Sequence, residues 1–430
     1  MRGLLMGRQS TRHVRSSGAR ALATAALAAV MAAPASGQVL SPERDLPEPA
    51  QLPSAEAPAP ETREGGFKFT PSFTFAYQYD DNLYATDSDT VSDTVLRARL
   101  NGTLESQWQR HALKLEAGTT ISRYMDFSSE DTEDYWLNLS GRRDLSPRSN
   151  LFGGVSVERA HEARGTAESF GGDEPTLYDK RRINLGLRTA SGANGLTLAG
   201  SVVEYDYRNT PAGGGILFND DRDRVHSTFG VRASHDYNPR WTLFAQATSD
   251  LRDYDLRFDD ALYQRDSSGY RVSVGARFAE AQRLQAEFMV GYLSQDYDDP
   301  RFDTVSAADY KASLRWFLSR SSHLSVNLDQ SLEETTLPGS PGYLYRKLSG
   351  SWSQRFTDRL FGKFSAAFAT ADYRQVALED DYYDLGAGLS HVLAKGILLN
   401  LDYRHLQRDS SQPGEDFSRN QYTLSISGRF

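Results

Sequence analysis

The residues of this chain that could do chemistry are mostly charged side chains spaced two apart. Arg97 and Arg99 form one such pair. In an extended strand, residues i and i+2 point to the same face, so the two guanidinium groups share a face. Rows of charge of this kind set ion selectivity in pores. We predict that nine basic residues line a water-filled pore: Arg97, Arg99, Arg182, Arg188, Arg232, Arg271, Arg277, Lys311 and Arg315.

A second interpretation of these basic residues stays open. Acidic residues are expected on the same face of the neighbouring strands, among them Glu116, Glu158, Glu204 and Glu287. Opposite charges on adjacent strands form cross-strand ion pairs, which stiffen a sheet without guiding any solute. The sequence does not choose between a row that guides anions and a wall of ion pairs.

Motifs of enzymes and cofactor sites are missing from the sequence. The chain contains no Gly-x-Ser-x-Gly, no His-Glu-x-x-His and no Gly-rich phosphate loop before a helix. It has 8 His, scattered along the chain, and 0 Cys, which excludes thiol catalysis, Cys zinc sites and disulfides. We predict no enzyme, no catalytic residue, no cofactor and no metal. A membrane hydrolase with Ser and His on neighbouring strands is a minor alternative.

The elements that position the charged residues are predicted to be β-strands. In residues 67–79 nearly every odd position is aromatic and nearly every even position is small or polar. Such a period of two gives a strand one apolar face and one wet face. About 18 segments of this kind follow one another up to Phe430, with no helical pattern of useful length between them.

Short and long connections alternate between the predicted strands. Residues 191–195 and 238–240 are short connections, whereas residues 161–178 and 208–223 are long ones. This alternation predicts an all-β fold, a transmembrane up-and-down antiparallel β-barrel of about 18 strands (16–18) over residues 66–430. A soluble sandwich or propeller fits less well. The sequence leaves open whether a long loop, such as 161–178 or 208–223, folds inward as a constriction.

Aromatic residues are sorted by strand end. Most of the 22 Tyr lie toward the long loops, Tyr178, Tyr254 and Tyr373 among them, whereas most of the 5 Trp flank short turns. Rings with a polar edge favour the headgroup level, so we expect two lipid-facing aromatic girdles. At the C-terminus one face carries a series that resembles the recognition strand read by the barrel-assembly machinery of bacterial outer membranes: Tyr422, Leu424, Ile426 and Phe430.

The first 65 residues are expected to lie outside the barrel. Five arginines, an Ala-rich apolar stretch over 21–33 and small residues at 35–37 predict a secretory signal peptide over residues 1–37. Six prolines in residues 38–65 predict a flexible periplasmic linker. Loss of the signal takes the net charge from −9 to −14, which disfavours nucleic acid as a partner.

The opening hairpin carries a family resemblance. The run Tyr79-Asp80-Asp81-Asn82-Leu83-Tyr84, followed by Ser92-Asp93-Thr94, resembles the first hairpin of the β-barrel porin type 2 family. The resemblance implies an outer-membrane porin or polysaccharide exit pore of a Gram-negative bacterium, often associated with exopolysaccharide production. It transfers no functional residue.

The sequence therefore predicts an outer-membrane channel for passive passage of small solutes or saccharides, with exopolysaccharide exit as the role that the resemblance implies. Its expected partners are outer-membrane lipid, lipopolysaccharide and, during biogenesis, the barrel-assembly machinery. A non-conducting structural or adhesive barrel is the alternative. The substrate, the ion selectivity and the oligomeric state are not determined by the sequence.

Overall fold

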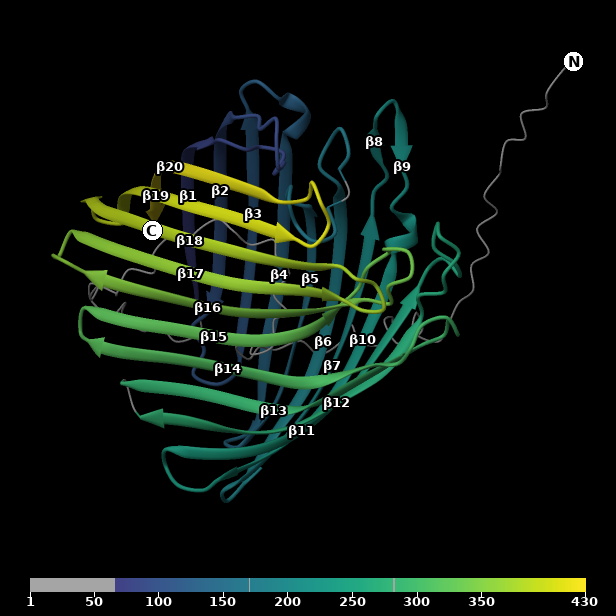
Figure 1. Cartoon of the computed structure of the whole chain (residues 1–430). Coiled ribbons are helices and arrows are strands. Elements are labelled where there is room, and N and C mark those ends of the chain that lie inside the picture. The colour runs from purple at the N-terminus through teal and green to yellow at the C-terminus, as the bar shows by residue number, and fades with distance from the viewer. Residues whose placement is uncertain (1–65, 170, 281–282) are drawn as a thin grey trace, which may run out of the picture.

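The described residues of this chain form a closed antiparallel barrel. The computed structural model describes residues 66–169, 171–280 and 283–430, so the predicted signal peptide and linker lie outside the described residues. An 18-stranded sheet closes on itself, and a small two-stranded hairpin stands in one loop (Figure 1). The prediction of an all-β up-and-down barrel is confirmed. In the part of the chain that the structure describes, no helix is long and apolar enough to cross a membrane.

The barrel strands follow one another in chain order. They are β1 Phe67–Asp80, β2 Asp93–Ser106, β3 Ala112–Tyr124, β4 Thr132–Ser146, β5 Ser149–His161, β6 Leu177–Ser191, β7 Asn194–Tyr207, β10 Arg224–Asp236, β11 Trp241–Tyr254, β12 Ser267–Glu280, β13 Leu284–Tyr297, β14 Val305–Ser319, β15 Ser322–Glu333, β16 Tyr343–Arg355, β17 Leu360–Tyr373, β18 Glu379–Ala394, β19 Ile397–Ser410 and β20 Phe417–Arg429. The loop hairpin consists of β8 Thr210–Ala212 and β9 Gly215–Leu217, and two short 3₁₀ turns are η1 Ser128–Glu130 and η2 Asp220–Arg222.

Pairing of the first and last strands closes the barrel. β1 pairs with β20 from Ser72 opposite Arg429 to Asp80 opposite Gln421. At the loop end of this seam the Arg419 Nε atom donates to both carboxylate oxygens of Asp80 at 2.9 Å. Short turns join the strands at one end of the barrel, and long loops join them at the other end, which we call the mouth.

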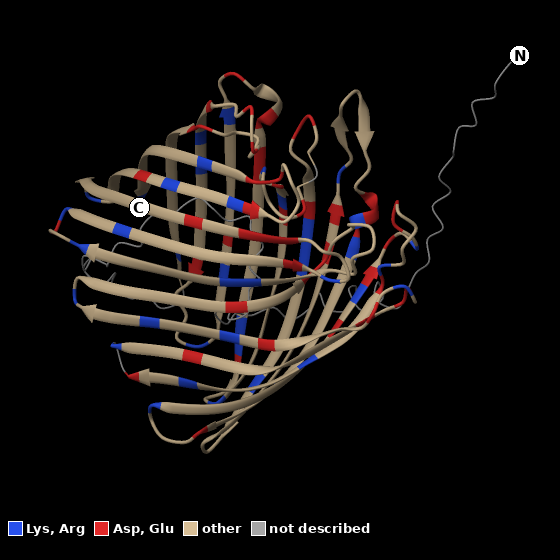
Figure 2. Ribbon diagram, viewed as in Figure 1, with Lys and Arg blue, Asp and Glu red and all other residues tan. Residues whose placement is uncertain are grey.

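Alternation along each strand gives the barrel two different faces. Phe75, Leu100 and Val290 lie on the outer face and are 49%, 46% and 56% exposed. A membrane would cover such an apolar surface, whereas the polar face is turned to the lumen. Figure 2 shows Lys and Arg along the strands and many of the Asp and Glu toward the mouth.

The predicted tyrosine girdle is only partly present. Tyr79, Tyr270 and Tyr422 are exposed on the outer face toward the mouth, as a girdle requires. Tyr178 and Tyr373, however, are buried at 5% and 4% exposure on the inner face. Tyr178 has the opposite parity to the outward Leu185 of the same strand, so it faces the lumen. Many tyrosines of this end therefore fill the mouth and do not contact lipid.

Candidate functional site in the lumen and at the mouth

The nine predicted basic residues lie on five strands of the barrel. They belong to β2, β6, β10, β12 and β14, on the face opposite the exposed apolar side chains. At least one other strand separates each of these five from the next. In β2, for example, Arg97 and Arg99 alternate with the exposed Leu96 and Leu100. The structure thus places these residues on one common face, and their role as a pore lining stays a prediction.

Some of the basic residues have partners on the wall. The Arg232 guanidinium reaches Glu287 at 3.0 Å and lies 3.5 Å from the Phe244 ring, while Arg271 lies 3.7 Å from Asp250. Further basic residues make neutral or aromatic contacts, or face an acid across a strand pair: Arg97 with Gln78 and Ser122, Arg99 over Trp136, Arg188 over Phe152, and Lys311 opposite Asp329. The ion-pair interpretation therefore holds for only part of the set.

The remaining three arginines carry charge that no acid neutralises by contact. Among the described residues, no carboxylate makes an ion pair with Arg182, Arg277 or Arg315. One predicted acid is also misplaced, because Glu204 has the parity of the outward Val202 and pairs with the outer-face Arg181 at 3.1 Å. The inner face consequently has less acid than the sequence suggested.

The C-terminal series lies on the outer face, as the alternation predicts. Tyr422, Leu424, Ile426 and Phe430 are between 37% and 63% exposed. The Phe430 ring stacks on Phe73 at 6.1 Å, and its backbone N–H donates to the Pro71 carbonyl at 3.1 Å. The terminal aromatic residue thus packs against the first strand. Its role in assembly stays a prediction.

One long loop folds inward across the mouth. This crossing loop, residues 162–176, joins β5 to β6, and Phe170 within it is outside the described residues. Arg222 donates from Nη1 to Glu162 at 2.9 Å, and Arg164 donates from Nε to Glu130 at 3.0 Å. Both pairs are largely buried, so the base of the loop is held by charge-assisted hydrogen bonds.

The tip of the crossing loop is held by the opposite side of the barrel. The Tyr373 hydroxyl on β17 donates to the Ala167 carbonyl at 3.0 Å and contacts Glu168 at 3.3 Å. Ala167 also packs against Tyr343 of β16 and Tyr373. By the strand order, β16 and β17 lie across the barrel from β5 and β6. The loop 161–178 is therefore the constriction that the sequence left open, and it narrows the mouth.

A second loop, residues 334–342, is tied down beside the crossing loop. Glu334 accepts hydrogen bonds from Arg252 and from the Tyr254 hydroxyl. The buried Arg265 donates to Asp259 at 2.8 Å and to the Leu337 carbonyl at 3.2 Å. Arg252 holds the pKa of Glu334 below its usual value, although burial alone would raise it. Glu334 is thus a fully engaged structural anion.

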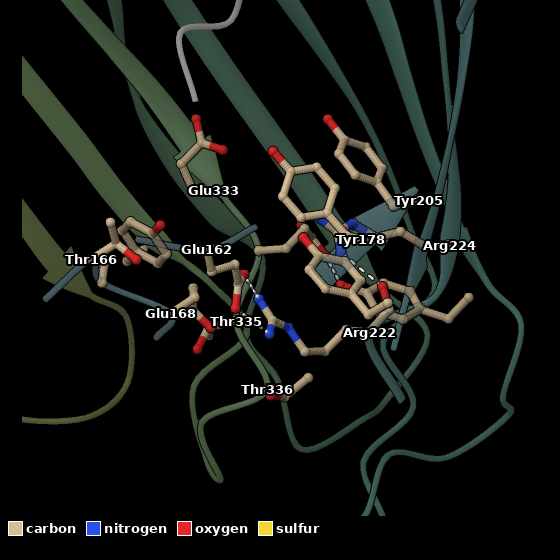
Figure 3. A pocket seen from close by; sticks show the side chains of 15 residues that line it. Glu162, Thr166, Glu168, Tyr178, Tyr205, Arg222, Arg224, Glu333, Thr335 and Thr336 are labelled. Atoms are coloured by element: carbon tan, nitrogen blue, oxygen red, sulfur yellow. Dashed lines mark hydrogen bonds and ion pairs between the residues drawn. The ribbon is translucent and has the colours of Figure 1, made fainter. Parts of the chain in front are cut away.

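Between these loops and the wall lies a cavity of about 110 Å³. Figure 3 shows its lining, in which Arg222 reaches Glu162 and Arg224 lies beside Tyr205. The rings of five tyrosines contribute to this lining: Tyr178, Tyr205, Tyr207, Tyr254 and Tyr343. Burial raises the pKa of Glu168, on the crossing loop, to about 7.

No motif in the sequence groups the residues of this cavity, although one signal for some of them is present. Tyr205, Tyr207 and Arg224 all have lumen-facing parity on their strands. Extending the alternation from the middle of each strand to its loop end would have found them. Arg222, Glu168 and Thr335 lie on loops, where no period applies, so the sequence holds no such signal for them.

A closed barrel of this kind defines a class of protein. An apolar outer face, a polar inner face and one end of long loops are the features of a porin-like outer-membrane channel. The chain belongs to the family described as "Putative beta-barrel porin 2", whose model matches residues 60–430. No curated protein matches the chain significantly.

Several solved outer-membrane proteins match this chain at low sequence identity. The outer-membrane protein OpdK from Pseudomonas aeruginosa has a TM-score of 0.46 and 11% identity, with 85% of this chain and 100% of that chain covered. OccAB3 from Acinetobacter baumannii has a TM-score of 0.45 and 13% identity, with 85% and 99% covered. A mutant ferric enterobactin receptor, PfeA, from Pseudomonas aeruginosa has a TM-score of 0.46 and 8% identity, with 86% and 81% covered.

Proposed function

We propose that this chain is a passive outer-membrane channel for small solutes, with a preference for anions. The observation that carries the proposal is the inner wall, where no carboxylate of the described residues makes an ion pair with Arg182, Arg277 or Arg315, and the acid opposite Arg277, Glu287, is bound to Arg232. A wall of 18 strands encloses a lumen too wide to be filled by side chains alone. Uncompensated guanidinium groups along such a lumen raise the local concentration of anions.

The crossing loop supports small solutes over polymers. Its tip contacts Tyr373 and Tyr343 on the far wall, so a solute must pass beside the loop at the mouth. Exit of an exopolysaccharide chain, the role implied by the family resemblance, requires this loop to leave its position. Small solutes or single saccharides need no such movement.

Reconstitution of the full chain in a planar lipid bilayer tests the proposal. Reproducible channel openings, with a reversal potential shifted toward anions in a salt gradient, are the expected result. If the barrel is folded, as judged by its heat-modifiable gel mobility, but opens no channels, the protein is instead structural or adhesive. Clear cation preference would retain the channel and reject the anion preference.

A hydrolase is separated from a channel by a different measurement. The cavity at the mouth is the place where carboxylates of different acidity meet, but Glu334 is already bonded to Arg252 and Tyr254. Hydrolysis of lipid or saccharide esters by the purified barrel would contradict a purely passive role.

A further inference from the structure

The guanidinium of Arg224 borders the cavity at the mouth without an ion-pair partner in the described part of the chain. Its Nη1 atom donates to the Arg222 carbonyl at 2.8 Å, and among the described residues no carboxylate makes an ion pair with it. Of the nearby acids, Glu162 binds Arg222, and Glu334 binds Arg252 while it attracts Arg224 only from beyond ion-pair distance. A guanidinium has five N–H donors, so Arg224 retains donors for a ligand.

Aromatic rings hold the Arg224 guanidinium in place. It lies 4.6 Å from the centroid of the Tyr205 ring and 5.8 Å from the centroids of Tyr207 and Tyr254. Stacking on rings leaves the edge of the planar group available for in-plane hydrogen bonds. The natural partner of that edge is a carboxylate, which matches the guanidinium in a two-point contact.

The rest of the lining suits hydroxyl groups. Glu333, Thr335 and Thr336 border the same cavity and supply carboxylate and hydroxyl oxygens. By the same measure of volume, one water molecule needs about 10–15 Å³, so about 110 Å³ accommodates a small organic solute and not a polymer. Tyrosine rings next to these polar groups offer stacking surfaces for a sugar ring.

We propose that this cavity binds a small polyhydroxylated carboxylate of the hexuronic acid class. Arg224 binds the carboxylate, the tyrosine rings face the sugar ring, and Glu333 and Thr336 accept hydrogen bonds from its hydroxyl groups. The inference deepens the proposed function, because a solute in transit meets this cavity at the mouth. Binding to the purified barrel can be measured without conductance, however. The proposed binding site can therefore be disproved without disproving the channel, and the channel without disproving the site.

Calorimetric titration of the full chain in detergent with glucuronate, and in parallel with glucose, tests the site. Glucuronate is expected to bind at least about tenfold more tightly than glucose, because hydrogen bonds to a charged group strengthen the contact. Arg224→Gln is expected to weaken glucuronate about tenfold or more and to leave glucose unchanged. Arg224→Lys, which keeps the charge but loses the two-point geometry, should fall between.

Arg181→Gln is the matched control, since it removes an arginine of the outer face whose guanidinium lies 3.1 Å from Glu204. It should retain glucuronate binding, and heat-modifiability shows that each variant is folded. Equal binding of glucose and glucuronate would overturn the proposal. So would an equal loss in Arg181→Gln, which would indicate attraction of glucuronate by the positive charge of the barrel in general. If Arg224→Gln does not fold, unchanged affinity in Arg224→Lys overturns the two-point contact.

Discussion

Single buried charges hold the seam and the mouth of this barrel together. Asp80 and Arg419 join the first strand to the last, with side-chain exposures of 2% and 11%. Asp80 also accepts from the Gln421 amide at 2.9 Å, and Arg419 contacts the Arg164 carbonyl of the crossing loop at 3.5 Å. The same pair thus supports closure of the sheet and the position of the loop.

Loss of one partner of this pair should be costly. Asp80→Ala leaves the Arg419 charge buried without compensation, and we expect the free energy of unfolding to fall by about 3–5 kcal/mol. Urea unfolding in lipid vesicles measures it. Glu204→Ala, which breaks an outer-face pair with about half-exposed side chains, should cost less than about 1 kcal/mol. Equal losses in both variants would contradict this account of the seam.

Glu168 makes the hold on the crossing loop depend on pH. Burial raises its pKa to about 7, above the ordinary 4.5, although Arg222 acts in the opposite direction. The anchored loop therefore binds the proton more tightly than a released loop does. Its stability is greatest below about pH 4.5 and declines as the pH rises through about 7.

A spin label on the crossing loop detects this release. The chain has no Cys, so Ala163→Cys gives a single labelling position. Label mobility is expected to rise between about pH 5 and about pH 8. Glu168→Gln, which stays neutral, should abolish the rise, whereas Glu174→Gln, at an exposed position of the same loop, should retain it. A rise that persists in Glu168→Gln would assign the pH dependence to another group.

At the scale of elements, the crossing loop reaches from one wall of the barrel across the mouth to the opposite wall. It is anchored at both its base and its tip, by Glu162 and Ala167 respectively. The β8–β9 hairpin differs, because Gly214 at its turn has open space around it, although the neighbouring Gly213 N–H donates to Asp173 of the crossing loop at 3.2 Å. Two neighbouring loops thus have different expected effects on passage.

Shortening the crossing loop should widen the channel. Replacement of residues 163–169 by a short Gly-Ser link removes the contacts with Tyr373, and single-channel conductance is expected to rise severalfold, because the obstructing chain is gone. Deletion of Gly214, which has open space around it, is the control and should leave conductance within the experimental scatter. An unchanged conductance after shortening would mean that the narrowest point lies elsewhere.

For the whole molecule, the net charge is −9, but the charge is unevenly distributed between the mouth and the inner wall. Acidic residues are frequent at the mouth (Figure 2), whereas strand alternation places Arg182, Arg277 and Arg315 on the inner wall. Selectivity follows from the local field inside the lumen and not from the total charge. The overall acidity is therefore compatible with passage of anions.

Neutralising the unpaired arginines together should remove the anion preference. The triple variant Arg182→Gln, Arg277→Gln, Arg315→Gln is expected to shift the reversal potential toward zero, and raising the salt to about 1 M should weaken the preference of the parent chain by screening. The control triple variant removes three outer-face charges: Arg123→Gln, Arg159→Gln and Arg181→Gln. It should leave selectivity unchanged. A shift of equal size in both would contradict selection by the inner wall.

Much of the architecture was predictable because alternation is a local property. Apolar residues two apart, together with alternating short and long connections, were sufficient for the barrel and for the faces of Arg97 and Arg232. The site was predictable only in part. Parity could place Tyr205 and Arg224 on the inner face, but no local pattern pairs Arg222 with Glu162, which lies 60 positions away.

The sequence by itself determined which face of each strand meets lipid, since a residue's side in a strand depends only on its position. Tertiary structure alone decided which loop crosses the mouth, which arginines stay without an acid, and which tyrosines surround Arg224. Those outcomes depend on contacts between a loop and strands on the opposite side of the barrel, such as Ala167 with Tyr373. They arise only when the sheet closes on itself.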